Sequence, residues 1–397
     1  MKRVFVGMVA LMVAMVATAA PVVAAGGNAD ERKFQVRFLI QPQMQVIQAK
    51  KNQPNYAGGA VTPDNNGIGQ EFYLRRTRVL LSGSVNKWIH FFFETDNPNL
   101  GRNGNIGGTF TQDGYIDFHF FTEFKVAMGM ILLPFTRHNR QSAASLMGLD
   151  YHTSVLSMWG PQRIWRDYGI EARGVVMDKI DYRVGVFRGF LSDPAAVGVL
   201  KATNDAPRIT GRVSYDFFGA DSKFFYPGTY LGKAKHLALG FGWDWQPEGG
   251  VTSKGKKRSY YGLTGDIYGE MPFGDGMAAT LNAGYIFYSW APKKIAYQTS
   301  QAFFGEAGFL WNNFQPVFGV EWASPIDTKT FKDVGVLNFR VGINYFIEGH
   351  NATVKLEYAS ERNNFGNLTT PGTPPGPKGD IENFRRSVVT LQTQLLF

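Results

Sequence analysis

Apolar and polar residues alternate along most of this chain, and this two-residue period limits the fold more than any other feature. In one stretch, Ile116, Phe118 and Phe120 occupy every second position, and Asp117 and His119 lie between them. A period of two places successive side chains on opposite faces of a β-strand, whereas a helix has a period of about 3.6. Because such stretches recur and helical periods are almost absent, the sequence predicts an all-β fold.

About sixteen stretches have this pattern. We expect strands at Phe34–Gln45, Glu71–Ser84, Trp88–Thr95, Gly114–Phe120, Phe124–Leu132, Asp167–Val175, Asp181–Phe190, Arg208–Phe217, Leu237–Trp245, Ser259–Tyr268, Met277–Tyr288, Ala302–Leu310, Phe314–Trp322, Val336–Phe346, Thr353–Glu361 and Ser387–Phe397.

The connections between these strands alternate between short and long. Ser84–Lys87 and Phe121–Glu123 are short, whereas Asp96–Asp113 and Leu133–Arg166 are long, and one connection on the short side, Phe218–His236, is itself long. Short turns at one end and long loops at the other are typical of transmembrane barrels. A sheet in hydrocarbon must close, because an unpaired backbone N–H or C=O there costs several kcal/mol. We therefore predict a transmembrane antiparallel up-and-down β-barrel of about sixteen strands. The alternative is a soluble all-β sandwich or propeller whose apolar face packs inward.

The N-terminus has the pattern of an export signal. Lys2 and Arg3 precede an apolar run, Val4–Ala20, and small residues follow it. This order is typical of a secretory signal peptide. We expect residues 1–25 to be the signal, with cleavage after Ala25, and residues 26–397 to form the barrel. An exported barrel of this kind belongs in the outer membrane of a diderm (Gram-negative) bacterium.

Several stretches together resemble a known family, the phosphate-selective porins of the O/P type. They are Phe72–Arg78 (FYLRRTR), Phe93–Asp96 (FETD), Asp113–Phe118 (DGYIDF), Gly129–Phe135 (GMILLPF), Arg166–Glu171 (RDYGIE) and Gly185–Gly189 (GVFRG). The resemblance implies a sixteen-stranded, usually homotrimeric channel for passive diffusion of small hydrophilic solutes, with anions such as phosphate as typical permeants. The terminal Phe397 is similar to the aromatic residue that the barrel-insertion machinery reads.

In channels of this class the third long loop folds into the lumen, so the connection from Leu133 to Arg166 is the expected constriction. Its basic residues are candidates for anion binding, because guanidinium groups replace the water around an oxyanion with forked donors. They are Arg137, His138, Arg140, Arg163 and Arg166, with Asp150 as the counter-charge.

Further basic residues fall on the polar phase of the strands and could line the lumen wall. They are Arg37, Arg76, Arg78, Lys125, Arg173, Arg183 and Lys355. Adjacent residues of a strand point to opposite faces, so Arg75 is expected near a membrane interface, where a long side chain can snorkel. Acidic residues on the same phase dilute the positive field, and we expect a modest preference for anions.

Other chemistry has little support in the sequence. It has no Cys, and its six His do not form a spaced metal-binding motif, so we expect no cofactor and no metal. Basic residues are spread singly, which disfavours nucleic acid as a partner, while lipid and lipopolysaccharide are expected around the barrel. Two alternatives to a channel remain. One is a structural sheath around a partner protein; the other is an outer-membrane lipid hydrolase that uses His152 with Ser154 or Ser157.

Overall fold

The computed structural model describes residues 32–49, 68–104, 106–152, 166–189, 206–251, 257–289, 299–326, 335–364 and 384–397. The expected signal segment, 1–25, and its cleavage point lie outside these residues. No helix among the described residues is long and apolar enough to cross a membrane.

The described residues form sixteen strands, one for each expected stretch. Their bounds are β1 Lys33–Ala49, β2 Ile68–Ser84, β3 Ile89–Asp96, β4 Phe110–Phe121, β5 Phe124–Leu132, β6 Arg166–Val176, β7 Ile180–Phe187, β8 Arg208–Asp216, β9 His236–Val251, β10 Lys257–Pro272, β11 Met277–Ser289, β12 Thr299–Trp311, β13 Phe314–Pro325, β14 Gly335–Glu348, β15 Ala352–Asn364 and β16 Phe384–Leu396.

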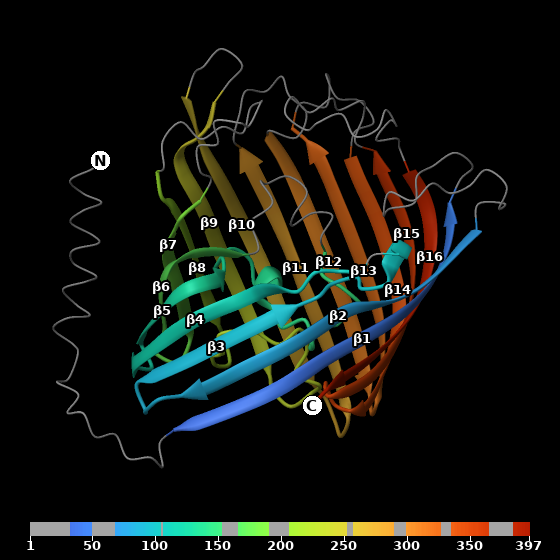
Figure 1. The fold of residues 1–397 in the computed structure, drawn as a ribbon, viewed down its shortest axis with the longest axis horizontal. Coiled ribbons are helices and arrows are strands. Elements are labelled where there is room, and N and C mark those ends of the chain that lie inside the picture. The colour runs from blue at the N-terminus through green and yellow to red at the C-terminus, as the bar shows by residue number, and fades with distance from the viewer. Residues whose placement is uncertain are drawn as a thin grey trace.

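The strands form one closed barrel in which each strand pairs with its neighbours in the sequence (Figure 1). Closure comes from the antiparallel pairing of β1 with β16, from Leu39 opposite Leu396 to Ala49 opposite Arg386. At this seam Phe38 and Phe397 exchange backbone hydrogen bonds of 2.8 and 3.1 Å, and their rings stack with centroids 5.6 Å apart. The predicted barrel and its strand number are confirmed.

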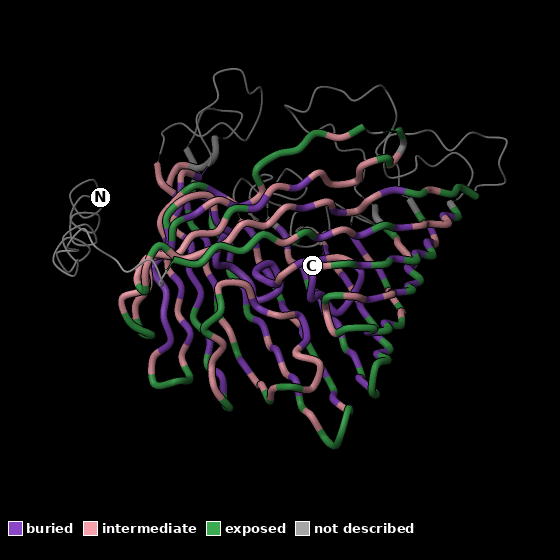
Figure 2. The backbone as a smooth tube through the Cα atoms, turned by 60° about the horizontal axis from the view of Figure 1, so that its bottom comes forward, coloured by how far each residue is buried: buried purple, intermediate pink, exposed green. Residues whose placement is uncertain are grey.

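The two faces of the wall have opposite chemistry, and buried and exposed residues alternate along the strands (Figure 2). On β14, Phe339, Val341 and Ile343 are exposed on the outer face, whereas Asn338 and Asn344 are buried on the inner face. An apolar exterior around a polar interior suits a wall that faces lipid outside and water inside. The alternative of a soluble fold with an inward apolar face is therefore wrong.

The ends of the barrel differ as expected. Residues 122–123, 177–179 and 312–313 are short connections at one end, where β16 also finishes beside the β14–β15 turn (Leu396 N–H to Asn351 O, 2.7 Å). Barrels of this type have their short turns on the periplasmic side, so this end is assigned as the inner mouth. The β8–β9 connection, residues 217–235, is the long exception at this mouth and is called the inner segment below.

Candidate functional site

The described part of the β5–β6 connection, residues 133–152, lies inside the barrel and is called L3 below (Figure 1). Its residues are almost all buried. Polar side chains of the distant wall hold its backbone: Gln394 Nε2 donates to Ala144 O (2.8 Å) and Lys355 Nζ donates to Gly148 O (2.9 Å). The expected inward fold of this loop is confirmed.

Arg140 fixes the first half of L3 to the wall on its own side. Its guanidinium donates to both carboxylate oxygens of Glu171, at 2.9 and 3.1 Å, and to the carbonyl of Phe224 at 3.2 Å. Both members of the pair are fully buried. Because neither side chain of this bidentate pair has solvent contact, the pair positions the loop and does not face a passing ion.

Arg137 is held differently, among aromatic rings. Its guanidinium carbon lies 3.9 Å from the ring centroid of Tyr268 and 4.4 Å from that of Tyr226, and Nη2 donates to the Tyr230 hydroxyl at 3.1 Å. Its backbone N–H, rather than its side chain, meets Asp266 (3.1 Å). The charge of Arg137 is therefore stabilised by π faces and hydroxyl groups.

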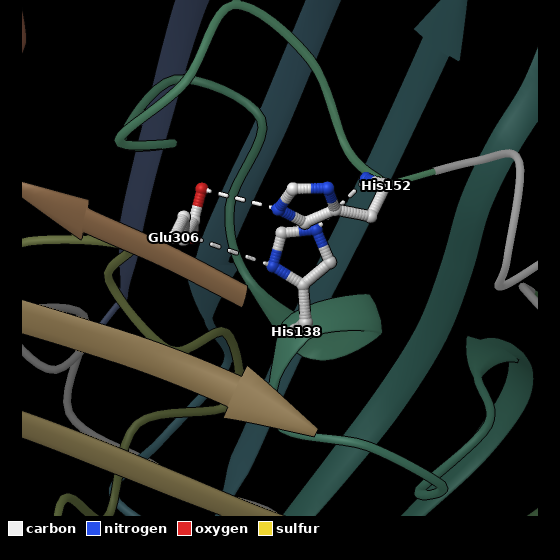
Figure 3. A group of neighbouring side chains, drawn as sticks. All are labelled: His138, His152 and Glu306. Carbon is white, nitrogen blue, oxygen red and sulfur yellow. Dashed lines mark hydrogen bonds and ion pairs between the residues drawn. The ribbon is translucent and has the colours of Figure 1, made fainter. Parts of the chain in front are cut away.

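His138 and His152 of L3 form a buried cluster with Glu306 of β12, drawn in Figure 3. Their nearest donor atoms all lie within 4.8 Å of one another, a spacing that suits a metal. However, His138 Nε2 accepts the backbone N–H of His152 at 3.0 Å. His138 Nδ1 lies 3.0 Å from the amide nitrogen of Asn282, so both ring nitrogens of His138 already have hydrogen-bond partners within the protein. The cluster does not offer three metal donors.

His152 instead ties L3 to three neighbouring strands. Its Nδ1 lies 2.9 Å from Glu321 of β13 and its Nε2 lies 3.5 Å from Glu306 of β12, while Arg340 of β14 completes the group at 2.5 Å from Glu321. Burial lowers the pKa of His152, but its hydrogen bonds to the two glutamates outweigh burial and raise the pKa above its ordinary value. Burial alone dominates for His138, whose pKa falls to about 3.

The anchor at His152 should therefore weaken in alkali. A raised pKa stabilises the folded loop fully below the unfolded value of about 6.5, and this contribution is lost as the pH rises through the raised pKa. We expect steady single-channel conductance at pH 6 and growing fluctuations from L3 at alkaline pH. In the His152→Asn variant the conductance should fluctuate at every pH. The conductance of His119→Asn, a substitution on the wall, should respond to pH as that of the native chain does. A pH response unchanged in His152→Asn would contradict the assignment.

The second strand contains the one clear error in the expected placement of basic residues. Arg75 was expected near an interface, yet its side chain lies 2.6 Å from Asp150 of L3, as Arg76 does at 2.5 Å. The cause is a register shift between Gln41 and Pro42, where Gln41 pairs with Arg76 and Pro42 with Leu74. This bulge leaves Arg75 unpaired and lets two adjacent arginines face the lumen. Their charges hold the pKa of Asp150 below its usual range despite burial, which alone would raise it.

Four wall residues on the inner face form a continuous basic row across strands β5 to β8. Lys125 pairs with Arg173, Arg173 with Arg183, and Arg183 with Arg212. Each arginine of the row has a carboxylate partner: Arg173 bonds both oxygens of Asp117, Arg183 contacts Asp181 at 3.3 Å, and Arg212 contacts Asp266. The row is therefore close to neutral as a whole.

The remaining expected residues lie outside this row. Arg166 begins β6 and contacts Asp113 at 2.8 Å; Arg78 contacts Glu94 at 2.7 Å and Asp96 at 2.9 Å. Lys355 donates hydrogen bonds to L3 carbonyl groups, as described above. Arg163 lies outside the described residues.

The inner segment is a second inward element that the sequence did not reveal. Its Tyr226 exchanges backbone hydrogen bonds with L3: Ser142 N–H donates to Tyr226 O (2.9 Å), and Tyr226 N–H donates to Arg140 O (3.0 Å). At Gly228 a Cβ would lie 2.5 Å from the Ser145 carbonyl, so the two backbones approach too closely for a side chain there. L3 and the inner segment thus enter from opposite mouths and meet.

Four further inward arginines were also missed, although the two-residue period places each of them on a polar phase. Arg208 contacts Asp244, Arg212 contacts Asp266, and Arg340 contacts Glu321. On β16, Arg386 lies 2.5 Å from Glu361. Each could have been found from alternation alone; their carboxylate partners could not.

Several cavities lie along the wall, one of about 350 Å³ against β1, β2 and β14–β16 and others along β1–β6. A cavity of about 450 Å³ lies towards the outer mouth and shares Arg78, Tyr151 and Arg166 with a narrow cavity of about 70 Å³. The narrow cavity shares Phe92 with a wide one at the inner mouth. The two cavities that share Tyr151 lie between L3 and the wall, and the smaller of them is also lined by Arg37.

Comparisons with known proteins agree with this architecture. Residues 49–197 match the model of the family described as phosphate-selective porin O and P. The fold is similar to the outer membrane channel DcaP of Acinetobacter baumannii, at 12% identity and a TM-score of 0.59, over 94% of this chain and 100% of that one. It is also similar to an anion-selective porin from Comamonas acidovorans, at 11% identity and a TM-score of 0.57, over 92% and 100%. Among curated proteins, none matches the sequence.

The chain is thus a closed antiparallel β-barrel whose fold is similar to those of outer-membrane channels and porins. Over residues 49–197 it carries the pattern of the phosphate-selective porin O and P family, which confirms the resemblance noted in its sequence.

Proposed function

We propose that this protein is a channel for passive diffusion of small hydrophilic solutes, with a modest preference for anions such as phosphate. The observation that carries the proposal is the narrow cavity between L3 and the wall. Three guanidinium groups, those of Arg37, Arg78 and Arg166, line it against the single carboxylate of Glu94. In a narrow, partly desolvated passage, fixed charges decide which ions enter.

Arg37 is the residue of this group most available to a permeating anion. Arg78 and Arg166 are engaged with carboxylates, as described above. Within the described part of the chain Arg37 makes no ion pair, and its Nε is buried without a hydrogen-bond partner. Because most other lumen cations are compensated, one such group supports a modest rather than a strong preference.

Arg37→Gln should therefore reduce anion selectivity. An opposite charge at about 4 Å is worth about 1 kcal/mol in water, or about fivefold in an equilibrium constant. We expect the anion-to-cation permeability ratio, measured from the reversal potential in a KCl gradient, to fall by up to about this factor. Lys179→Gln, in an exposed turn at the inner mouth, removes the same charge and should leave the ratio unchanged. A cation-selective native channel would contradict the proposal.

Arg137 and Arg140 have a different place in this proposal from the one the sequence suggested for them. Both are buried in L3 and their terminal nitrogens donate hydrogen bonds within the protein, so we assign them to shaping the constriction. The basic row Lys125–Arg173–Arg183 and Lys355 would act on permeating ions through the electrostatic field in the lumen.

The assembly of the channel is also proposed. A homotrimer is supported by the similar fold of OmpT from Vibrio cholerae, solved in a trimer form, at 10% identity and a TM-score of 0.50, over 92% of this chain and 99% of that one. The exposed Phe397 at the barrel seam is accessible to the insertion machinery. Residues 1–25 would direct export, and lipid and lipopolysaccharide would surround the apolar exterior.

The alternatives to a channel have less support. A sheath for a partner protein needs an open lumen, which L3 and the inner segment occupy. A lipid hydrolase needs a histidine that faces lipid, whereas His152 is buried against Glu306 and Glu321 inside the barrel. Ser154 and Ser157 lie outside the described residues.

A further inference from the structure

The smallest of the cavities described above combines charged and apolar side chains. The guanidinium groups of Arg37, Arg78 and Arg166 contribute positive charge, and Arg37 and Arg78 alternate with Leu39 and Leu80 on β1 and β2. Six large apolar side chains, called the apolar face below, line it beside the polar residues Glu94, Gln141, Ser142 and Tyr151: Leu39, Leu80, Phe92, Leu132, Phe225 and Leu396. Lumen surfaces of diffusion channels are ordinarily polar, so an apolar face at the tightest point requires a reason.

Two structural elements fix the apolar face. Phe225 comes from the inner segment, and its ring meets that of Phe92 on β3 edge to face, with centroids 5.4 Å apart. Both pack on a cluster of buried apolar residues that includes Tyr115 and Leu133. The backbone bonds between Tyr226 and L3 prevent the segment from withdrawing. The face is therefore a permanent part of the passage.

A cavity of this kind discriminates between anions by their hydration. An inorganic anion is hydrated on all sides, and it loses water against the apolar face without any compensating contact. A carboxylate with a short hydrocarbon part can point its charge at the guanidinium groups and place its apolar part against Phe92 and Phe225. Each CH₂ removed from water in this way contributes about 0.8 kcal/mol.

We propose that the passage favours small organic carboxylates with an apolar part over inorganic anions and over carboxylates without one. This inference rests on the proposed anion conduction and names the class of anion that the route suits. Phe225 is then a specificity-determining residue, although it belongs to a segment that enters from the mouth opposite to L3.

A homologous series of carboxylates tests the inference. Reversal potentials at pH 8 give the permeabilities of formate, acetate, propionate and butyrate relative to chloride, each divided by its mobility in water. A purely aqueous pore makes this ratio fall with chain length. We expect it to rise from formate to butyrate in the native channel, by up to about tenfold if two CH₂ groups meet the apolar face.

Phe225→Ser should abolish the rise of the permeability ratio with chain length, so that the ratio falls from formate to butyrate. Phe218→Ser is the matched control, because Phe218 lies on the same segment but is exposed and does not line the cavity. Should Phe225→Ser fail to fold, Leu80→Ser alters the same face from the wall, and it should have the same effect.

The outcomes separate the two proposals. An anion-selective native channel whose ratio falls with chain length overturns the inference and leaves anion conduction intact. A native channel without anion selectivity overturns both. A rise that persists in Phe225→Ser and Leu80→Ser shows that this face is not its source, and the inference fails.

Discussion

Replacement of residues 218–235 by a four-residue turn is expected to raise the single-channel conductance several-fold. The inner segment fills lumen space with Phe224, Phe225 and Tyr226, and its backbone bonds keep L3 in place. The neighbouring β10–β11 connection, residues 273–276, shows that a short turn is compatible with this mouth. Planar-bilayer recording in KCl measures the change directly.

Lys223→Ala provides the control for this experiment. Its side chain lies on the same segment, is 62% exposed, and makes a loose ion pair of 3.9 Å with Asp221 and a contact with the Tyr230 ring, 5.3 Å from its centroid, so the conductance should not change. An unchanged conductance after the replacement would show that the inner segment does not limit the current.

The second large effect is expected for Arg140→Ala. Removing one member of a buried ion pair leaves the other charge uncompensated, at a cost of about 3–5 kcal/mol. Glu171 would be that charge, and L3 would also lose its bond to Phe224 O. We expect a closed barrel with a displaced L3, detected as protease cleavage within residues 133–152 and as an unsteady current.

Two variants make the Arg140 result specific. Arg102→Ala removes a partly exposed pair with Glu71 and should have little effect, since such pairs contribute about 0–1 kcal/mol. Arg140→Leu combined with Glu171→Leu removes both charges together and should restore much of the order of L3. Equal cleavage of L3 in the native chain and in Arg140→Ala would argue against this anchoring role.

The barrel itself was predictable because alternation and connection length are local properties. A two-residue period in a segment such as Phe124–Leu132 fixes which side chains share a face, and each face has to meet one solvent. The same rule correctly put Arg173 and Arg183 on the inner wall. It could not supply Asp117 as the partner of Arg173, because pairing across strands depends on register, whereas Asp181 lies two residues before Arg183 on the same face of β7.

Two features could not be predicted from the sequence because they depart from the regular alternation of strands and short turns. Arg75 reaches the lumen through a bulge opposite Pro42. A single extra residue in a strand exchanges the inward and outward faces for all residues on one side of the bulge. The inner segment looked like an unusually long turn, and its sequence gives no sign of its direction. Its inward course depends on contacts with Tyr115 and with L3, residues that lie far away along the chain.

L3 has a mechanical consequence for the whole protein. It hydrogen-bonds to strands all around the barrel, from Gln41 on β1 and Glu171 on β6 to Asn344 on β14 and Gln394 on β16. Because these bonds connect L3 to several sides of the wall, they should resist flattening of the barrel cross-section when lateral pressure in the bilayer changes. We therefore expect the conductance of this barrel to depend little on the thickness of the surrounding lipid bilayer.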